Sequence, residues 1–121
     1  MAEMDVALKD AAQIDGAIGA ALVDRSSGMA LGTGGGNNDF SLTVAANTDV
    51  INAKLRAIEM LAIPGPMQDV LVTLETQYHL IRPITGRCGQ ELFLYLALDK
   101  DRANLALARD QLRAIEQNLD I

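Results

Sequence analysis

Three features of this chain could in principle do chemistry: His79, Cys88 and the glycine-rich stretch at 32–36. The histidine lies in an alternating apolar run with no Ser or Cys beside it, which favours a half-buried structural ring over a general base. Cys88 lies in a glycine-flanked loop where Arg87 alone could lower the thiol pKa, so a nucleophilic role is not expected. The stretch at 32–36 lacks the Lys-Ser/Thr pair of a phosphate-binding loop and is interpreted as a mobile connection.

Acidic side chains are the remaining candidates, and they are scattered without the spacing of a metal site. Asp39 or Ser41 is expected to cap the helix that follows them. Asp99 and Asp101 are expected in the cap region of the last helix, where the helix dipole favours negative charge. The sequence therefore predicts no catalytic residue, no cofactor and no metal, and we expect a protein that is not an enzyme.

Length and composition narrow the class of protein further. The chain has 121 residues and a formal net charge of -6, with 50% hydrophobic and 21% charged residues. A chain of this length can form one domain, 1–121, with its own core. The high hydrophobic fraction excludes a disordered chain. The acidic balance argues against nucleic-acid binding, no apolar run is long enough to insert in a membrane, and the acidic N-terminus does not resemble a secretory signal. A single cysteine suits a reducing compartment, so a cytoplasmic location is expected.

The hydrophobic periodicity predicts eight elements in the order helix, two strands, helix, three strands, helix. The expected helices are 4–13, 42–63 and 101–119, and the expected strands are 17–23, 29–31, 67–74, 78–84 and 92–98. Most of these strands are apolar on both faces, so both faces of the sheet need covering. We expect an α+β three-layer α/β/α sandwich, with one helix on one side of the sheet and two on the other.

The middle helix, 42–63, carries two apolar stripes. A bulky stripe that would pack on the sheet contains Val44, Ile51, Leu55, Ile58 and Ala62. The second stripe, at spacings of four and three, contains Ala46, Val50, Ala53, Ala57 and Met60. Small residues at this spacing are typical of a helix pair, so we expect a second chain here, most simply an identical copy related by a two-fold axis. The alternative is that the alanines are good helix formers facing water.

A narrow polar edge separates the two stripes. It consists of Thr48, Asp49, Asn52, Arg56 and Glu59. The contact between two such helices, here called the helix seam, buries a small area compared with the 1,200–2,000 Å² or so that a stable interface buries. We therefore expect an edge strand or loops to contribute to the same interface.

The order of these segments and several short motifs resemble the roadblock/LC7 family, from about Ile14 to Leu119. The motifs are Ile14-Asp15-Gly16-Ala17, Val23-Asp24-Arg25 with Ser27-Gly28, and the runs at 69–74, 78–83, 92–99 and 102–106. The resemblance implies a profilin-like fold with a five-stranded antiparallel sheet ordered 2-1-5-4-3, one central helix on one face and two terminal helices on the other. It also implies homodimers, or heterodimers with paralogues, in which central helices pack side by side and third strands pair. Val70 and Val72, in the third strand, would then join the interface of the second stripe.

The resemblance further implies a regulator or scaffold of a small Ras-like GTPase in bacterial-type signalling. It implies that the GTPase binds over the paired central helices and that this binding stimulates its hydrolysis of GTP. A sensor-kinase-like protein is a further implied partner. The polar edge, Thr48, Asp49, Asn52, Arg56 and Glu59, then holds the candidate GTPase contacts, although an ion pair between Arg56 and Glu59 is the preferred interpretation of that arginine. The alternative is a small-ligand-sensing or general protein-interaction module without a GTPase. Only four aromatic residues are present, and we expect a filled core.

Overall fold

The computed structural model of this chain describes residues 3–35, 41–84 and 91–119. Cys88, Arg87 and Asp39 lie outside these ranges, and so do the side chains of Ser41 and Leu42. The expected loop thiol and the expected cap of the middle helix therefore stay predictions.

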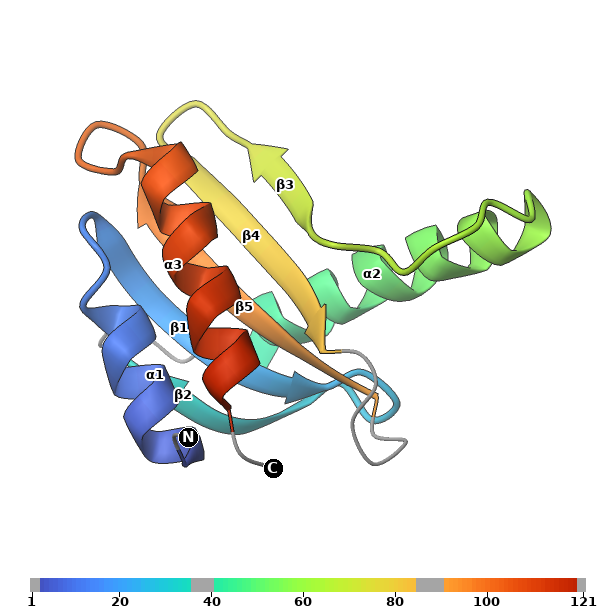
Figure 1. Cartoon of the computed structure of the whole chain (residues 1–121), viewed down its shortest axis with the longest axis horizontal. Helices are drawn as coiled ribbons and strands as arrows, with labels where there is room; N and C mark the ends of the chain where they lie inside the picture. Colours follow the sequence, from blue (N-terminus) through green and yellow to red (C-terminus); the bar gives the residue numbers. More distant parts are fainter. Residues whose placement is uncertain (1–2, 36–40, 85–90, 120–121) are drawn as a thin grey trace.

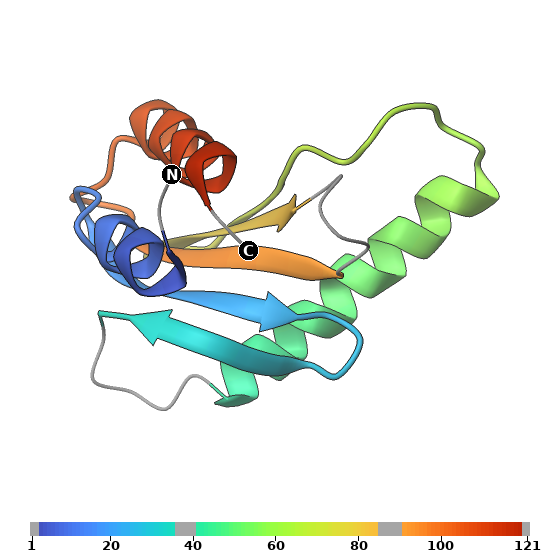
Figure 2. The same cartoon turned by 60° about the horizontal axis from the view of Figure 1, so that its bottom comes forward.

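Helices and strands follow one another in the predicted order. The helices are α1 (Met4–Ala12), α2 (Ser41–Met60) and α3 (Leu105–Asn118), and the strands are β1 (Ala17–Asp24), β2 (Met29–Gly34), β3 (Val70–Thr73), β4 (Gln77–Ile84) and β5 (Leu92–Asp99). The strands form one antiparallel sheet in the order β2-β1-β5-β4-β3, so β2 and β3 are its edges. α1 and α3 cover one face and α2 crosses the other (Figures 1 and 2). The expected α+β three-layer sandwich is confirmed.

Each face of the sheet has its own core, because successive side chains of a strand point to opposite faces. β5 shows this most clearly: Leu92, Leu94, Leu96 and Leu98 pack under α1 and α3, whereas Phe93, Tyr95 and Ala97 pack toward α2. On the α2 side, Val44 and Ile51 of the bulky helical stripe are fully buried. All these side chains are at most a few per cent exposed.

The glycine-rich stretch is partly a strand. Gly32 and Gly34 belong to β2 and lie beneath α1. A Cβ on Gly34 would overlap the backbone carbonyl of Leu8, and one on Gly32 would lie 2.9 Å from Cδ1 of the same leucine. The expectation of a connection over all of 32–36 was therefore wrong, because these glycines let helix and strand approach closely.

The ends of three elements differ from the predictions for identifiable reasons. α3 begins at Leu105 because Asn104 is its cap: the Asn104 side chain accepts a hydrogen bond from the Leu107 N–H at 3.1 Å. Asp99 instead closes a turn by accepting from the Asp101 N–H, which corrects the predicted cap region. β3 is shorter than 67–74. Before it, the Gln68 carbonyl accepts a hydrogen bond from Arg82 and Asp69 pairs with Arg109 of α3, and after it the Leu74 N–H donates to the Gln77 carbonyl at 2.8 Å in the turn to β4.

α2 ends at Met60 in a Schellman motif. The Ile63 N–H donates to the Ile58 carbonyl at 3.2 Å and the Ala62 N–H to the Glu59 carbonyl at 3.1 Å. Ala62 has a φ of 53°, in the left-handed region that glycine usually occupies at this position. The residue before a proline avoids the helical region, so Ile63 could not continue the helix into Pro64.

Candidate interaction surfaces

α2 extends past the sheet that it covers (Figures 1 and 2). Its first half is anchored by the buried Val44 and Ile51, whereas Met60 at its end is 84% exposed. Leu61 and Ile63, just after the helix, are exposed as well. The far end of α2 therefore presents bulky apolar side chains that its own sheet does not cover.

The second stripe of α2 faces away from the sheet. Ala46 and Ala53 are exposed, Val50 is 44% exposed and Ala57 is half-buried. The stripe thus forms a surface of small and aliphatic side chains that runs along the helix to Met60, and none of its members belongs to the described core on the α2 side of the sheet.

A strip of the sheet beside edge strand β3 is also incompletely covered on the α2 side. Val70 and Val72 are half-buried, and Val72 lies opposite His79 of β4 in the strand register. The His79 and Tyr95 rings pack in a T-shaped arrangement with centroids 5.5 Å apart, and Nε2 of His79 lies 2.8 Å from Gln77 Oε1. Burial lowers the pKa of His79 below its usual 6.5, so the ring is neutral at pH 7. The expected half-burial of His79 is confirmed.

Two members of the predicted polar edge are held within the fold. Thr48 is only 5% exposed, and its hydroxyl donates to the Val44 carbonyl at 2.8 Å. The expectation that Thr48 lies on an exposed edge is therefore corrected. Asn52 is half-buried: its Oδ1 accepts from Arg25 Nη1 and its Nδ2 donates to the Arg25 carbonyl, both at 3.0 Å.

Arg25 belongs to the same surface, although it was not among the contact residues predicted from the sequence. It follows β1 in the hairpin turn, and besides Asn52 it pairs with Glu91 at 3.5 Å. A hollow of about 290 Å³ lies between the hairpin and α2; Arg25, Ser26, Asn52, Leu55, Arg56 and Glu59 line it. A second hollow of about 240 Å³ shares Arg25, Ser26 and Asn52 and continues to Asp49. The only local signal was the Val23-Asp24-Arg25 motif at the hairpin.

Arg56 and Glu59 do not form the ion pair that was preferred in the sequence interpretation. Both side chains are exposed, and no ion pair joins either of them to another residue in 3–35, 41–84 or 91–119. Arg56 is therefore a cation at the rim of the hairpin hollow without an anionic partner in the described part of the chain.

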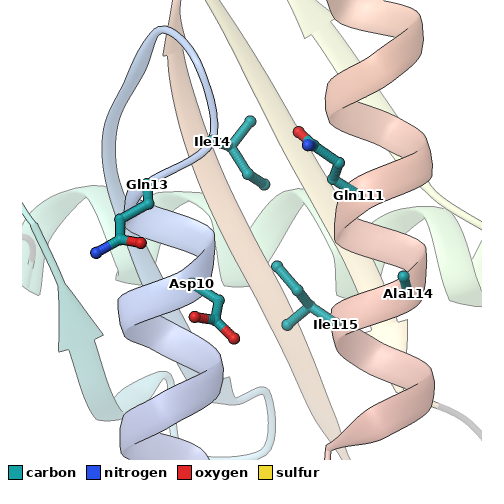
Figure 3. A pocket seen from close by; sticks show the side chains of 6 residues that line it. All are labelled: Asp10, Gln13, Ile14, Gln111, Ala114 and Ile115. Atoms are coloured by element: carbon teal, nitrogen blue, oxygen red, sulfur yellow. The ribbon is translucent and has the colours of Figure 1, made fainter.

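A hollow on the opposite face of the sheet lies between α1 and α3 and measures about 330 Å³ (Figure 3). Asp10, Gln13, Ile14, Gln111, Ala114 and Ile115 line it. It is open to the surface and contains no nucleophile or histidine.

No metal centre is formed by the described residues, which contain no group of three or more His, Cys, Asp or Glu side chains suited to an ion. Among the same residues, no helix is long and apolar enough to cross a membrane. The structure thus offers surfaces for contact.

No family model matches the sequence, and no curated protein matches it. Solved structures do resemble the fold. A roadblock/LC7 domain from Streptomyces avermitilis has a TM-score of 0.80 at 14% identity, covering 96% of this chain and 93% of that one. Myxococcus xanthus MglB has a TM-score of 0.78 at 12% identity, covering 93% and 87%. An MglB structure described as having a tetrameric arrangement has a TM-score of 0.67 at 16% identity, covering 93% and 87%. Across nearly its whole length, this chain has the roadblock/LC7 fold.

Proposed function

We propose that this chain is a dimeric, non-catalytic regulator or scaffold of a small Ras-like GTPase, acting in the cytoplasm. The observation that carries the proposal is the second stripe of α2, which is apolar and exposed. The likeness to MglB structures, one of them described as tetrameric, supports an assembling protein.

The proposed dimer joins two identical chains through α2 and β3. Ala46, Ala53 and Ala57 are small enough for two helices to approach closely, and Val50 and Met60 supply aliphatic area. β3 has a free edge for strand pairing, and Val70 and Val72 lie on the face of the sheet toward α2. In this proposal the helix seam and the strand edge both contribute to the interface, because one seam alone is small compared with a stable interface.

The proposed GTPase contact is the polar rim beside that seam. Asp49, Arg56 and Glu59 are exposed, and Arg56 lacks an anionic partner among the described residues. Asn52 acts by fixing the hairpin through Arg25. We assign the chain a positioning role toward the GTPase. A sensor-kinase-like protein is a further partner in this proposal.

The dimer is tested by light scattering and sedimentation at micromolar concentration. The expected mass is twice the 12.9 kDa of one chain. Ala53→Glu buries an unpaired charge in the seam and should weaken association at least about tenfold. Ala45→Glu is the matched control, because Ala45 is equally exposed but lies about a quarter turn away from Ala53 around α2. A monomer at these concentrations, or equal effects of the two variants, would contradict the proposed interface.

The GTPase is tested with the Ras-like GTPases encoded in the same genome, each loaded with GDP or a non-hydrolysable GTP analogue. One of them should bind the wild-type chain in a nucleotide-dependent way. Arg56→Ala should weaken that binding about tenfold while leaving the dimer intact. Failure of every such GTPase to bind would leave a general protein-interaction module as the function. A small-ligand sensor is the alternative function.

A further inference from the structure

The hollow between α1 and α3 lies on the face of the sheet away from the proposed dimer and GTPase surfaces. Ile14 and Ile115 lie between the two helices, while Asp10 reaches toward the gap from α1 and Gln111 from α3 (Figure 3). Ile14 is buried and Ile115 half-buried, so the hollow has an apolar floor below polar walls.

Exposed aliphatic side chains extend this hollow in both directions. Val6 lies one turn before Asp10 on α1 and is 50% exposed, and Leu107 lies one turn before Gln111 on α3 and is 45% exposed. Residues four apart share a helix face, so each lies in line with a wall of the hollow. α1 and α3 run antiparallel (Figure 1), which places Val6 and Leu107 at opposite ends. We call this surface the α1/α3 groove; it comprises Val6, Asp10, Ile14, Leu107, Gln111 and Ile115.

The described walls of the α1/α3 groove carry one charge, that of Asp10. Among residues 3–35, 41–84 and 91–119, no other charged residue lines the hollow. The Asp10 carboxylate makes no hydrogen bond or ion pair with another residue in the described ranges, and neither does the Gln111 amide. Arg113, a nearby cation on α3, pairs with Asp110 at 3.6 Å and does not line the hollow, and nor does Lys9. A bound cation would therefore complement Asp10.

We propose that the α1/α3 groove is a docking surface for a short basic amphipathic helix of another protein. Its aliphatic side chains pack on Ile14 and Ile115 between Val6 and Leu107, and a Lys or Arg pairs with Asp10. Both walls are helices, which offer no free backbone edge for an added strand, whereas a third helix can pack its ridges along the gap between them. The groove is separate from α2 and β3, so this docking is independent of the proposed dimer and GTPase.

The probe for this proposal is a Leu/Lys peptide of about four helical turns, with a Leu/Glu peptide of the same pattern as its counterpart. Backbone amide and methyl NMR spectra of the full chain are recorded during titration with each. The Leu/Lys peptide should shift resonances of Val6, Ile14, Leu107 and Ile115, and the Leu/Glu peptide should not. Asp10→Asn should weaken binding about two- to fivefold, and Leu107→Gln about tenfold.

Asp49→Asn is the matched control, because it removes the same charge from an exposed site on α2, at the opposite face. It should leave the affinity unchanged. Equal losses for Asp49→Asn and Asp10→Asn, or shifts spread over the acidic surface, would show attraction by net charge alone and overturn the proposal. Groove resonances that move on simple dilution of the chain would identify a second copy as the occupant, which also overturns it.

Discussion

Arg109 of α3 donates two hydrogen bonds to Asp69, one from Nε and one from Nη2, each 2.9 Å long. Asp69 is the residue just before edge strand β3, so this bidentate pair ties the edge of the sheet to the helix layer above it. Arg82 of β4 adds a second tie, donating to the Gln68 carbonyl at 3.3 Å and to Glu116 of α3 at the same distance. β3, the strand proposed to pair in the dimer, is thus held in place by contacts with α3 on the face of the sheet opposite α2.

Asp69→Asn should therefore lower the free energy of unfolding by about 1–2 kcal/mol, because it removes the charge from a bidentate, part-buried pair. Denaturation in urea measures this, and amide exchange of β3 should accelerate. The control is Asp110→Asn, which breaks the exposed i,i+3 pair with Arg113 and should cost about 0.5 kcal/mol or less. Similar losses for the two variants would mean that the tie to β3 has no special role.

Ala62→Gly should raise the free energy of unfolding by about 1 kcal/mol. The native φ of 53° at Ala62 is strained for a residue with a Cβ and free for glycine, while the Schellman hydrogen bonds of the backbone stay unchanged. Ala45→Gly, in the exposed interior of α2 and outside the second stripe, should have the opposite sign and cost about 1 kcal/mol. Thermal and urea unfolding of both variants check the pair. Destabilisation by both would refute the assigned helix end.

Gly34→Ala should destabilise the protein by about 1–3 kcal/mol, because a Cβ at this position meets the Leu8 carbonyl, which is backbone and cannot rotate away. Gly32→Ala should cost less, since its Cβ meets the Leu8 Cδ1, at the end of a flexible side chain. Calorimetry on the two variants measures the difference. A larger loss for Gly32→Ala than for Gly34→Ala would contradict the described packing of α1 on β2.

Much of this fold could be predicted from local pattern. The alternation of leucine with Phe93, Tyr95 and Ala97 along β5 indicates a sheet buried on both faces, and the spacing of Val44 and Ile51 identifies the side of α2 that packs on it. Such periodicities depend on neighbours within one element, so they can be read before any tertiary contact is known.

The ties that shape the surfaces could not be predicted in this way. Arg25 and Asn52 are 27 positions apart and Arg109 and Asp69 are 40 apart, so their pairing depends on how the elements pack. Glycine is typical of loops, and only the close approach of α1 explains why Gly34 lies in a strand. Arg56 was assigned to Glu59 on spacing alone, a weak surface interaction that the folded chain does not adopt.

The pKa of His79 gives a prediction about pH. Burial places the folded-state pKa below the 6.5 of the unfolded chain, so the unfolded state binds a proton first as the pH falls. The neutral ring therefore makes its full contribution to the free energy of unfolding above about pH 6.5. This contribution is lost as the pH falls from 6.5 toward the folded-state pKa. The difference in unfolding free energy between wild type and His79→Phe, measured from pH 8 to 5, should follow this course.

His79 is the only histidine in the chain, so one imidazole resonance reports its titration by NMR. The midpoint should lie below 6.5; a midpoint at or above this value would contradict the described burial. The ring also lies opposite Val72 of the edge strand, within the strip assigned to the dimer. Covering that strip with a second copy desolvates the ring further, so the midpoint should fall as the protein concentration rises through the dimer dissociation constant. In Ala53→Glu, whose association should be at least about tenfold weaker, the midpoint should begin to fall only at correspondingly higher concentration, because only association changes the surroundings of the ring.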